Sequence, residues 1–155
     1  MKTIIKNLTL TTFLAFALAA FAPSTSVADQ PGRHPAYLHA LDDLRDARAH
    51  LERRPGDPIV KWDEHVAIKE IDAAIRAIQQ ASIDDGKNLA DHPPIDARLD
   101  YSGRLHHALE LLRKAHNDVK GEEDNNFAHG LQHLSLEHID AAIQFTQQGI
   151  ANAGF

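Results

Sequence analysis

The sequence predicts an all-α protein, an antiparallel four-helix bundle built from two duplicated helical hairpins. Residues 37–84 align without a gap to residues 105–152 at a constant offset of 68, and 14 of these 48 pairs are identical. Four segments carry apolar residues at helical spacing, and short polar turns divide each copy into two segments. A repeat this short cannot bury its own apolar stripe, so we expect the two copies to pack on each other.

Residues 1–28 have the pattern of a cleavable secretory signal peptide. Lys2 and Lys6 precede an apolar run, Leu8–Phe21, that is short for a membrane span, and the small residues Ser26-Val27-Ala28 follow it. We predict cleavage after Ala28, which leaves one domain over residues 29–155. We therefore expect an exported protein, periplasmic or secreted, that does not enter a membrane once the signal is removed.

The amino-acid composition limits which kinds of partner and which kinds of cysteine chemistry this protein can have. Without residues 1–28 the chain has a net charge of −8, because the leader holds two of the 16 basic residues and none of the 22 acidic ones. This balance argues against nucleic acid, which needs a basic face. All 11 histidines lie beyond the leader, so the charge depends on pH near 6.5. The chain has no cysteine, which excludes disulfides and a lipidated cysteine.

The first predicted helix starts near Pro35, a residue suited to a first helical turn, and its copy ends at Gly121. The second is predicted to begin at Asp57-Pro58, a capping acid followed by proline, and to end before Gly86. The four apolar stripes are, in chain order, Tyr37, Ala40, Leu41, Leu44, Ala47 and Leu51; Ala67, Ile68, Ile71, Ala74, Ile75 and Ile78; Leu105, Ala108, Leu109, Leu112, Ala115 and Val119; and Leu136, Ile139, Ala142, Ile143, Thr146 and Ile150.

Predicted turns at about 53–57 and 121–125 make each copy an antiparallel hairpin. The linker between the copies, about residues 82–102, is much longer and has no helical period. Loops of this length inside a compact domain are usually functional or disordered. Its polar residues could close over a cluster of histidines; they are Asp84, Asp85, His92 and Asp96.

Three segments resemble those of a group of uncharacterised exported bacterial helical-bundle proteins: residues 34–41 (HPAYLHAL), 83–88 (IDDGKN) and 122–125 (EEDN). The resemblance covers nearly all of the chain after the leader and implies no activity. In helical arrangement and histidine content the chain is also similar to the periplasmic small metal-binding proteins, although it has no regular histidine repeat.

The segment predicted as the fourth helix holds the best constellation for chemistry. His129, His133 and Glu137 follow one another at four-residue steps, and two histidines at this spacing can bind one divalent ion. Gly130 weakens the helix between them. The alternative is an ordinary solvated polar flank, which a histidine-rich helix also produces.

If both hairpin turns lie at the same end of the bundle, further histidines join this group. The candidate metal ligands are then His129, His133, Glu137, His116, His65 and His50. With no cysteine, and methionine only at position 1, imidazole and carboxylate favour zinc, nickel or copper(II). In the same layer we expect a structural ion pair between Arg48 and Glu64, since buried charges must be paired.

A second group is expected at the opposite end and facing away from the core. It comprises His39, Asp43, Asp46 and His50, with His106, His107, Glu110, His92 and His34 nearby. An ordinary solvated face is the alternative here as well. Because we expect His50 to face outward in this group, replacing His39 and His50 should affect metal binding little. We expect a structural role for His138.

Two interpretations of function remain open. The first is an exported bundle that binds or buffers a divalent metal ion through histidine and carboxylate clusters, and the second is an envelope or secreted protein-interaction or stress module without metal. The chain contains no His-Glu-x-x-His, no phosphate-binding glycine loop and no Gly-x-Ser-x-Gly, so an enzyme is the least supported class.

Overall fold

The structure, a computed structural model, describes residues 35–82, 89, 94, 98–121 and 128–154. The predicted signal peptide, His34, residues 122–127 and most of the linker, with Asp84, Asp85, His92 and Asp96, lie outside the described residues. None of the described helices is both long and apolar enough to cross a membrane.

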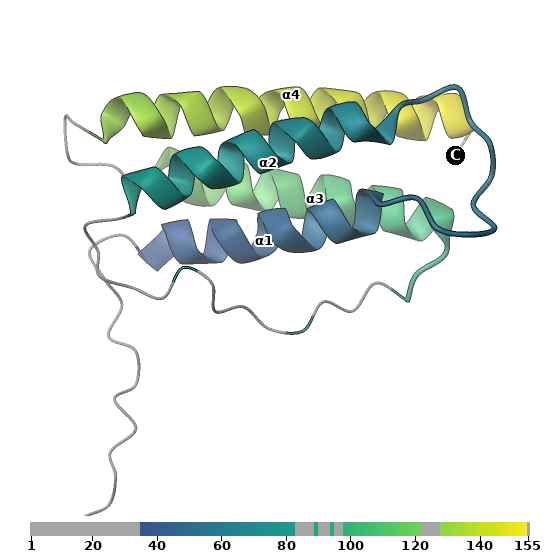
Figure 1. The fold of residues 1–155 in the computed structure, drawn as a ribbon, viewed down its shortest axis with the longest axis horizontal. Coiled ribbons are helices and arrows are strands. Elements are labelled where there is room, and N and C mark those ends of the chain that lie inside the picture. The colour runs from purple at the N-terminus through teal and green to yellow at the C-terminus, as the bar shows by residue number, and fades with distance from the viewer. Residues whose placement is uncertain (1–34, 83–88, 90–93, 95–97, 122–127, 155) are drawn as a thin grey trace, which may run out of the picture. The chain divides into compact units, whose positions relative to one another are not determined.

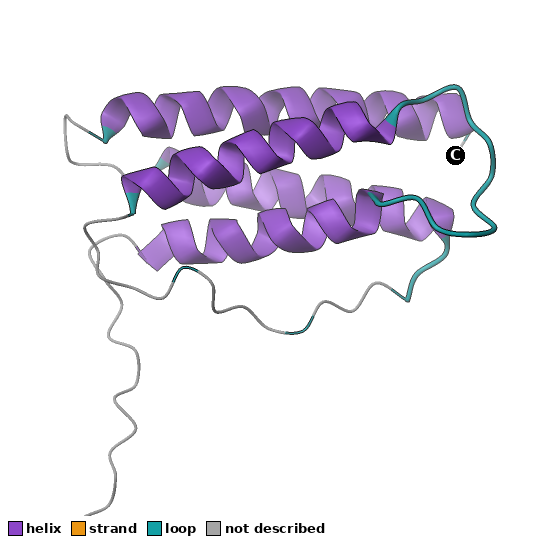
Figure 2. Ribbon diagram, viewed as in Figure 1, coloured by secondary structure: helices purple, strands orange, loops and turns teal. Residues whose placement is uncertain are grey.

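The part of the chain that the structure describes is all-helical, and the predicted fold class is confirmed (Figures 1 and 2). The helices are α1 (Pro35–Leu51), α2 (Glu64–Ala81), α3 (Tyr101–Lys120) and α4 (His129–Ala153). The apolar stripes form a common core: those of α1 and α3 are buried throughout, and Ile71, Ile78 and Ile139 close it from the other two helices.

Each helix packs antiparallel against two neighbours. Asp43 and His50 of α1 meet Lys114 and His107 of α3, so the residue numbers run in opposite directions along this pair. Arg48–Asp72, Glu70–His138 and His116–Asp140 link α1 to α2, α2 to α4 and α3 to α4. The parallel helices α2 and α3 are therefore diagonal partners, joined by the long linker.

The most extensive contacts lie between the copies, α1 against α3 and α2 against α4, rather than within each hairpin. Glu70 and His138 are equivalent positions of the two copies, and Glu70 Oε2 lies 2.6 Å from His138 Nδ1. This contact marks an approximate two-fold axis that runs across the helices. His138 thus has the structural role that its mid-helix position predicts.

The two-fold axis places the short connections at opposite ends of the bundle (Figure 1). The expectation that both turns share one end was therefore wrong. An axis across the helices reverses the direction of every equivalent element, so the turn of one copy must lie opposite the turn of the other.

The second helix begins at Glu64 and not at Asp57, so the connection after α1 is longer than predicted. Asp63 is its N-cap, accepting from His65 N–H at 3.1 Å. Asp57 has another use: it accepts from Arg54 N–H at 2.7 Å and pairs with Arg104. Gly56, at a φ of 94°, provides the turn between them, a backbone conformation that glycine favours.

The predicted Arg48–Glu64 ion pair does not form, although both residues are paired. Arg48 Nε lies 2.8 Å from Asp72, and the buried Glu64 lies 2.9 Å from Arg53 Nε. The repeat accounts for the first pairing, because Arg48–Asp72 in the first copy is equivalent to His116–Asp140 in the second, where the distance is 3.4 Å.

Ile71→Ala and Ile139→Ala should destabilise the protein by similar amounts, about 2–5 kcal/mol each. Both side chains are fully buried at equivalent positions of one core. Thermal unfolding followed by circular dichroism should show a single transition for either variant. Two transitions, with one half still folded, would contradict a shared core.

Candidate metal centre

Asp46, His50 and His107 form a compact group of possible metal ligands. Asp46 and His50 lie one turn apart on α1, so their side chains share a flank, and antiparallel packing brings His107 of α3 against them. One ligand atom from each lies within 4.8 Å of the others. His50 Nε2 is 3.4 Å from Asp46 Oδ1, and the two imidazole rings meet edge to face with centroids 4.8 Å apart.

His50 is completely buried, yet neither ring nitrogen has a hydrogen-bond partner among the described residues. The adjacent Asp46 Oδ1 is also buried and without a hydrogen bond there. A buried polar group left in this state costs about 1–3 kcal/mol. Neutral His50 has one N–H and one lone pair, and Asp46 Oδ1 has lone pairs of its own; none of them is in a hydrogen bond among the described residues, and a bound cation would satisfy the lone pairs.

Electrostatics favours the neutral form of His50. Burial lowers the pKa of His50; Asp46 opposes this, whereas the charges of His107, Arg54 and Arg104 act in the same direction as burial. Neutral imidazole is the form that binds a metal ion. His107 is only partly buried, so it connects the buried imidazole with the surface.

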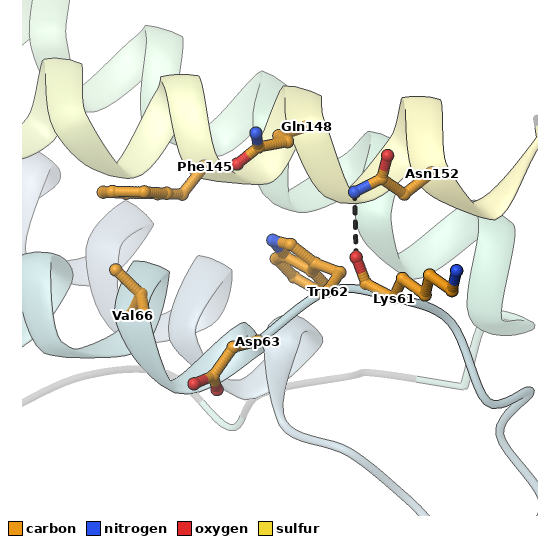
Figure 3. A pocket seen from close by; sticks show the side chains of 7 residues that line it. All are labelled: Lys61, Trp62, Asp63, Val66, Phe145, Gln148 and Asn152. Atoms are coloured by element: carbon orange, nitrogen blue, oxygen red, sulfur yellow. Dashed lines mark hydrogen bonds between the residues drawn. The ribbon is translucent and has the colours of Figure 1, made fainter.

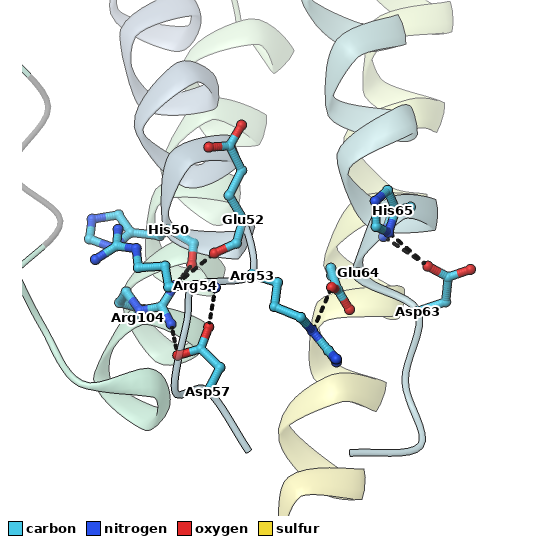
Figure 4. Close-up of polar contacts among 9 residues, drawn as sticks. All are labelled: His50, Glu52, Arg53, Arg54, Asp57, Asp63, Glu64, His65 and Arg104. Atoms are coloured by element: carbon cyan, nitrogen blue, oxygen red, sulfur yellow. Dashed lines mark hydrogen bonds and ion pairs between the residues drawn. The ribbon is translucent and has the colours of Figure 1, made fainter. Parts of the chain in front are cut away.

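Arg104 fixes the end of α1 beside this group (Figure 4). Its guanidinium is 2% exposed and donates to the carbonyl oxygens of His50 at 3.1 Å and Glu52 at 2.9 Å. It also pairs with Asp57. The His50 carbonyl belongs to the last turn of α1 and the Glu52 carbonyl follows the helix directly, so neither has a partner within the helix. Sequence reasoning missed Arg104, although it lies four residues before Ala108 on the α3 stripe.

The second copy of the repeat carries a cation at the equivalent place. The offset of 68 relates Asp46 to Lys114, His50 to Asp118 and His107 to His39. Lys114 Nζ donates to the buried Asp43 at 2.8 Å. This hydrogen bond raises the pKa of Lys114, and the charges of Asp43 and Asp118 act in the same direction. The second copy thus has a lysine at this place, whereas the first copy has the carboxylate of Asp46 and the imidazole of His50.

A second compact group, Asp63, Glu64 and His65, is less suited to a metal ion. Asp63 caps α2, and Glu64 is paired with Arg53 (Figure 4). The side chains of Asp63 and His65 are 69% and 83% exposed, so water already solvates both.

The structure does not gather the six ligands predicted from sequence into one site. His133 lies 3.4 Å from Glu137 on the exposed side of α4, and His116 lies 3.4 Å from Asp140. His129 is exposed near the α3–α4 connection, whereas His50 and His65 lie near the opposite end. The positions of the turns explain this separation.

The predicted outward stripe on α1 is also only partly outward. His39 is exposed, but Asp43 and His50 are buried because α3 covers them. The expectation that His50 faces solvent was wrong. A helical wheel of α1 alone cannot show the width of the face that α3 covers.

Comparison with protein-family models, with curated proteins and with solved structures gives no match.

Asp57→Asn should lower the free energy of unfolding at neutral pH by about 1–3 kcal/mol, because the buried Arg104 loses its counter-charge. Burial alone would raise the pKa of Asp57, but hydrogen bonds from Arg104 and Arg54, and their charges, hold it below its ordinary value. The charged form therefore stabilises the fold above pH 3.8, and this contribution is lost as pH falls through the folded-state pKa.

Urea unfolding in steps from about pH 7 to about pH 3 should show the difference between wild type and Asp57→Asn shrinking in acid. Glu137→Gln is the control, because its exposed carboxylate should contribute within about 0.5 kcal/mol. A difference that is constant with pH would contradict the assigned charge interaction.

Proposed function

We propose that this protein is an exported helical bundle that binds a divalent metal ion through Asp46, His50 and His107. The observation that carries the proposal is the buried His50 imidazole, which has no hydrogen bond in the described chain and lies against a carboxylate and a second imidazole. Buried polar groups are nearly always satisfied, so a site that leaves them open is suited to a ligand.

The donor set favours a borderline divalent cation. Two imidazoles and one carboxylate suit zinc, nickel or copper(II), whereas calcium and magnesium prefer sites made of oxygen. Three protein ligands leave at least one coordination position for water or another ligand. The group is assembled by two helices of a packed bundle, which limits how far the ligands can move.

The duplicated copy shows that this group is not a requirement of the shared fold. The second copy carries Lys114 where the first carries Asp46, and Asp118 where the first carries His50. Lys114 is paired with Asp43, whereas Asp46 and His50 lie beside each other with no lysine. Export follows from the signal-peptide pattern of residues 1–28, so binding or buffering of metal outside the cytoplasm is the role that we propose.

Zinc should bind the untagged protein lacking residues 1–28 with a Kd of about 1 μM or tighter, and should raise its melting temperature by mass action. Asp46→Lys, which installs the residue of the second copy, should abolish binding because an ammonium competes with the ion. His107→Gln should weaken binding at least about tenfold. Calorimetric titration and thermal melts measure both effects.

Replacing His129 and His133 together by alanine is the matched control and should leave the affinity unchanged. If this double variant lost binding while Asp46→Lys retained it, the metal site would lie on α4 and not at Asp46, His50 and His107. The absence of saturable binding by wild type would contradict the proposal and favour the alternative of a protein-interaction or stress module.

A further inference from the structure

Asp43 is a buried carboxylate in the middle of α1, on the flank that packs against α3. Its side chain is 9% exposed, and Oδ1 accepts from Lys114 Nζ of α3 at 2.8 Å. Oδ2 is also buried, and it has no hydrogen-bond partner among the described residues. Both oxygens of a charged carboxylate are acceptors, so the charged form of Asp43 leaves one of them unsatisfied.

The counter-charge of Asp43 lies largely in water. The Lys114 side chain is 63% exposed, so solvent screens its ammonium group while the carboxylate is kept away from solvent. Burying a charge is unfavourable unless its partner compensates the lost hydration fully. The pair with Lys114 therefore offsets only part of the cost of a negative charge at Asp43.

A second carboxylate acts against the charge of Asp43. Asp118 lies one turn beyond Lys114 on α3, and its Oδ2 is likewise buried without a hydrogen bond in the described chain. Burial is the largest effect on Asp43 and raises its pKa. The hydrogen bond and charge of Lys114 lower this pKa, the charges of Asp118 and Asp42 raise it, and the result is a pKa above the ordinary value. α2 packs on another flank of α1, at Arg48.

The other copy shows that the fold does not need a carboxylate at this place. The residue equivalent to Asp43 is Leu111, which packs against the core. The residue equivalent to Lys114 is Asp46, so the pair as a whole belongs to one copy. An uncharged side chain is therefore compatible with this position of the helix pair.

We propose that Asp43 is a proton-binding site of the α1–α3 interface, and that its protonation strengthens this interface in acid. The folded protein holds the proton more tightly than the unfolded chain does. The resulting stabilisation is fully present below pH 3.8 and is lost as pH rises through the folded-state pKa. Asp57, which pairs with Arg104 of the same α3, stabilises the fold only when it is charged. Two carboxylates that contact α3 thus respond to acid in opposite directions.

Titration of the ¹³C-labelled untagged protein between about pH 7 and about pH 3, followed by NMR of the aspartate carboxyl carbons, tests the proposal. The Asp43 midpoint should lie above 3.8, and the Asp57 midpoint below it. Lys114→Met should raise the Asp43 midpoint, because it removes the hydrogen bond and the positive charge, and Asp118→Asn should lower it. Lys120→Met removes an exposed charge of the same helix and is the matched control, which should leave the midpoint unchanged. An Asp43 midpoint at or below 3.8, or one that does not move in these directions, would overturn the proposal.

Urea unfolding measures whether the bound proton strengthens the fold. Asp43→Asn keeps the shape of the side chain and removes its titration. The urea midpoint of wild type relative to Asp43→Asn should therefore fall as pH rises from about 4 to about 7. The same comparison with Asp57→Asn should move in the opposite direction. A relative midpoint for Asp43→Asn that is constant with pH, or that rises, would overturn the proposed effect of the proton.

Discussion

Arg104 joins three parts of the chain through one buried positive charge. It binds carbonyl oxygens at the end of α1, a carboxylate in the connection to α2, and through its own backbone it belongs to the first turn of α3. The negative end of the α1 dipole and Asp57 compensate the cost of burying this charge. Because Arg104 fixes α3 against the end of α1, it also determines where His107 meets His50.

Because the chain is duplicated, each residue of one copy can be compared with its equivalent in the other. The apolar stripes and the Arg48–Asp72 and His116–Asp140 pairs are present in both copies and so belong to the shared fold of the hairpin. The two copies differ in their buried charged residues. Burial raises the pKa of Asp43, and the hydrogen bond and charge of Lys114 oppose this rise. At the equivalent place the first copy has Asp46 beside His50, with no lysine.

The sequence predicted the fold because helical stripes are local and the 68-residue offset is read directly. It named His50 as a metal ligand, but together with residues of α4, and it placed Asp46 and His107 only in a second group in which Asp46 and His50 were expected to face outward. His50 is buried because α3 packs over it. The position of α3 on α1 depends on the direction of the two-fold axis, and the apolar stripe of a single helix does not predict that direction. The start of α2 was misplaced for a similar reason: Asp57 suits an N-cap by type, but Arg104, 47 residues away, uses its carboxylate.

The connection from α1 to α2 lies at the end of the bundle where α3 begins and α4 ends (Figure 1). Arg104 holds the first part of the α1–α2 connection beside His50, and Asn152 and Gly149 hold its last residues, Lys61 and Trp62, against α4 (Figure 3). The equivalent positions of the second copy hold Lys114 and Asp118 in place of Asp46 and His50. A packed end of this bundle therefore does not require the carboxylate and imidazole pair, and the fold alone does not explain why they lie together.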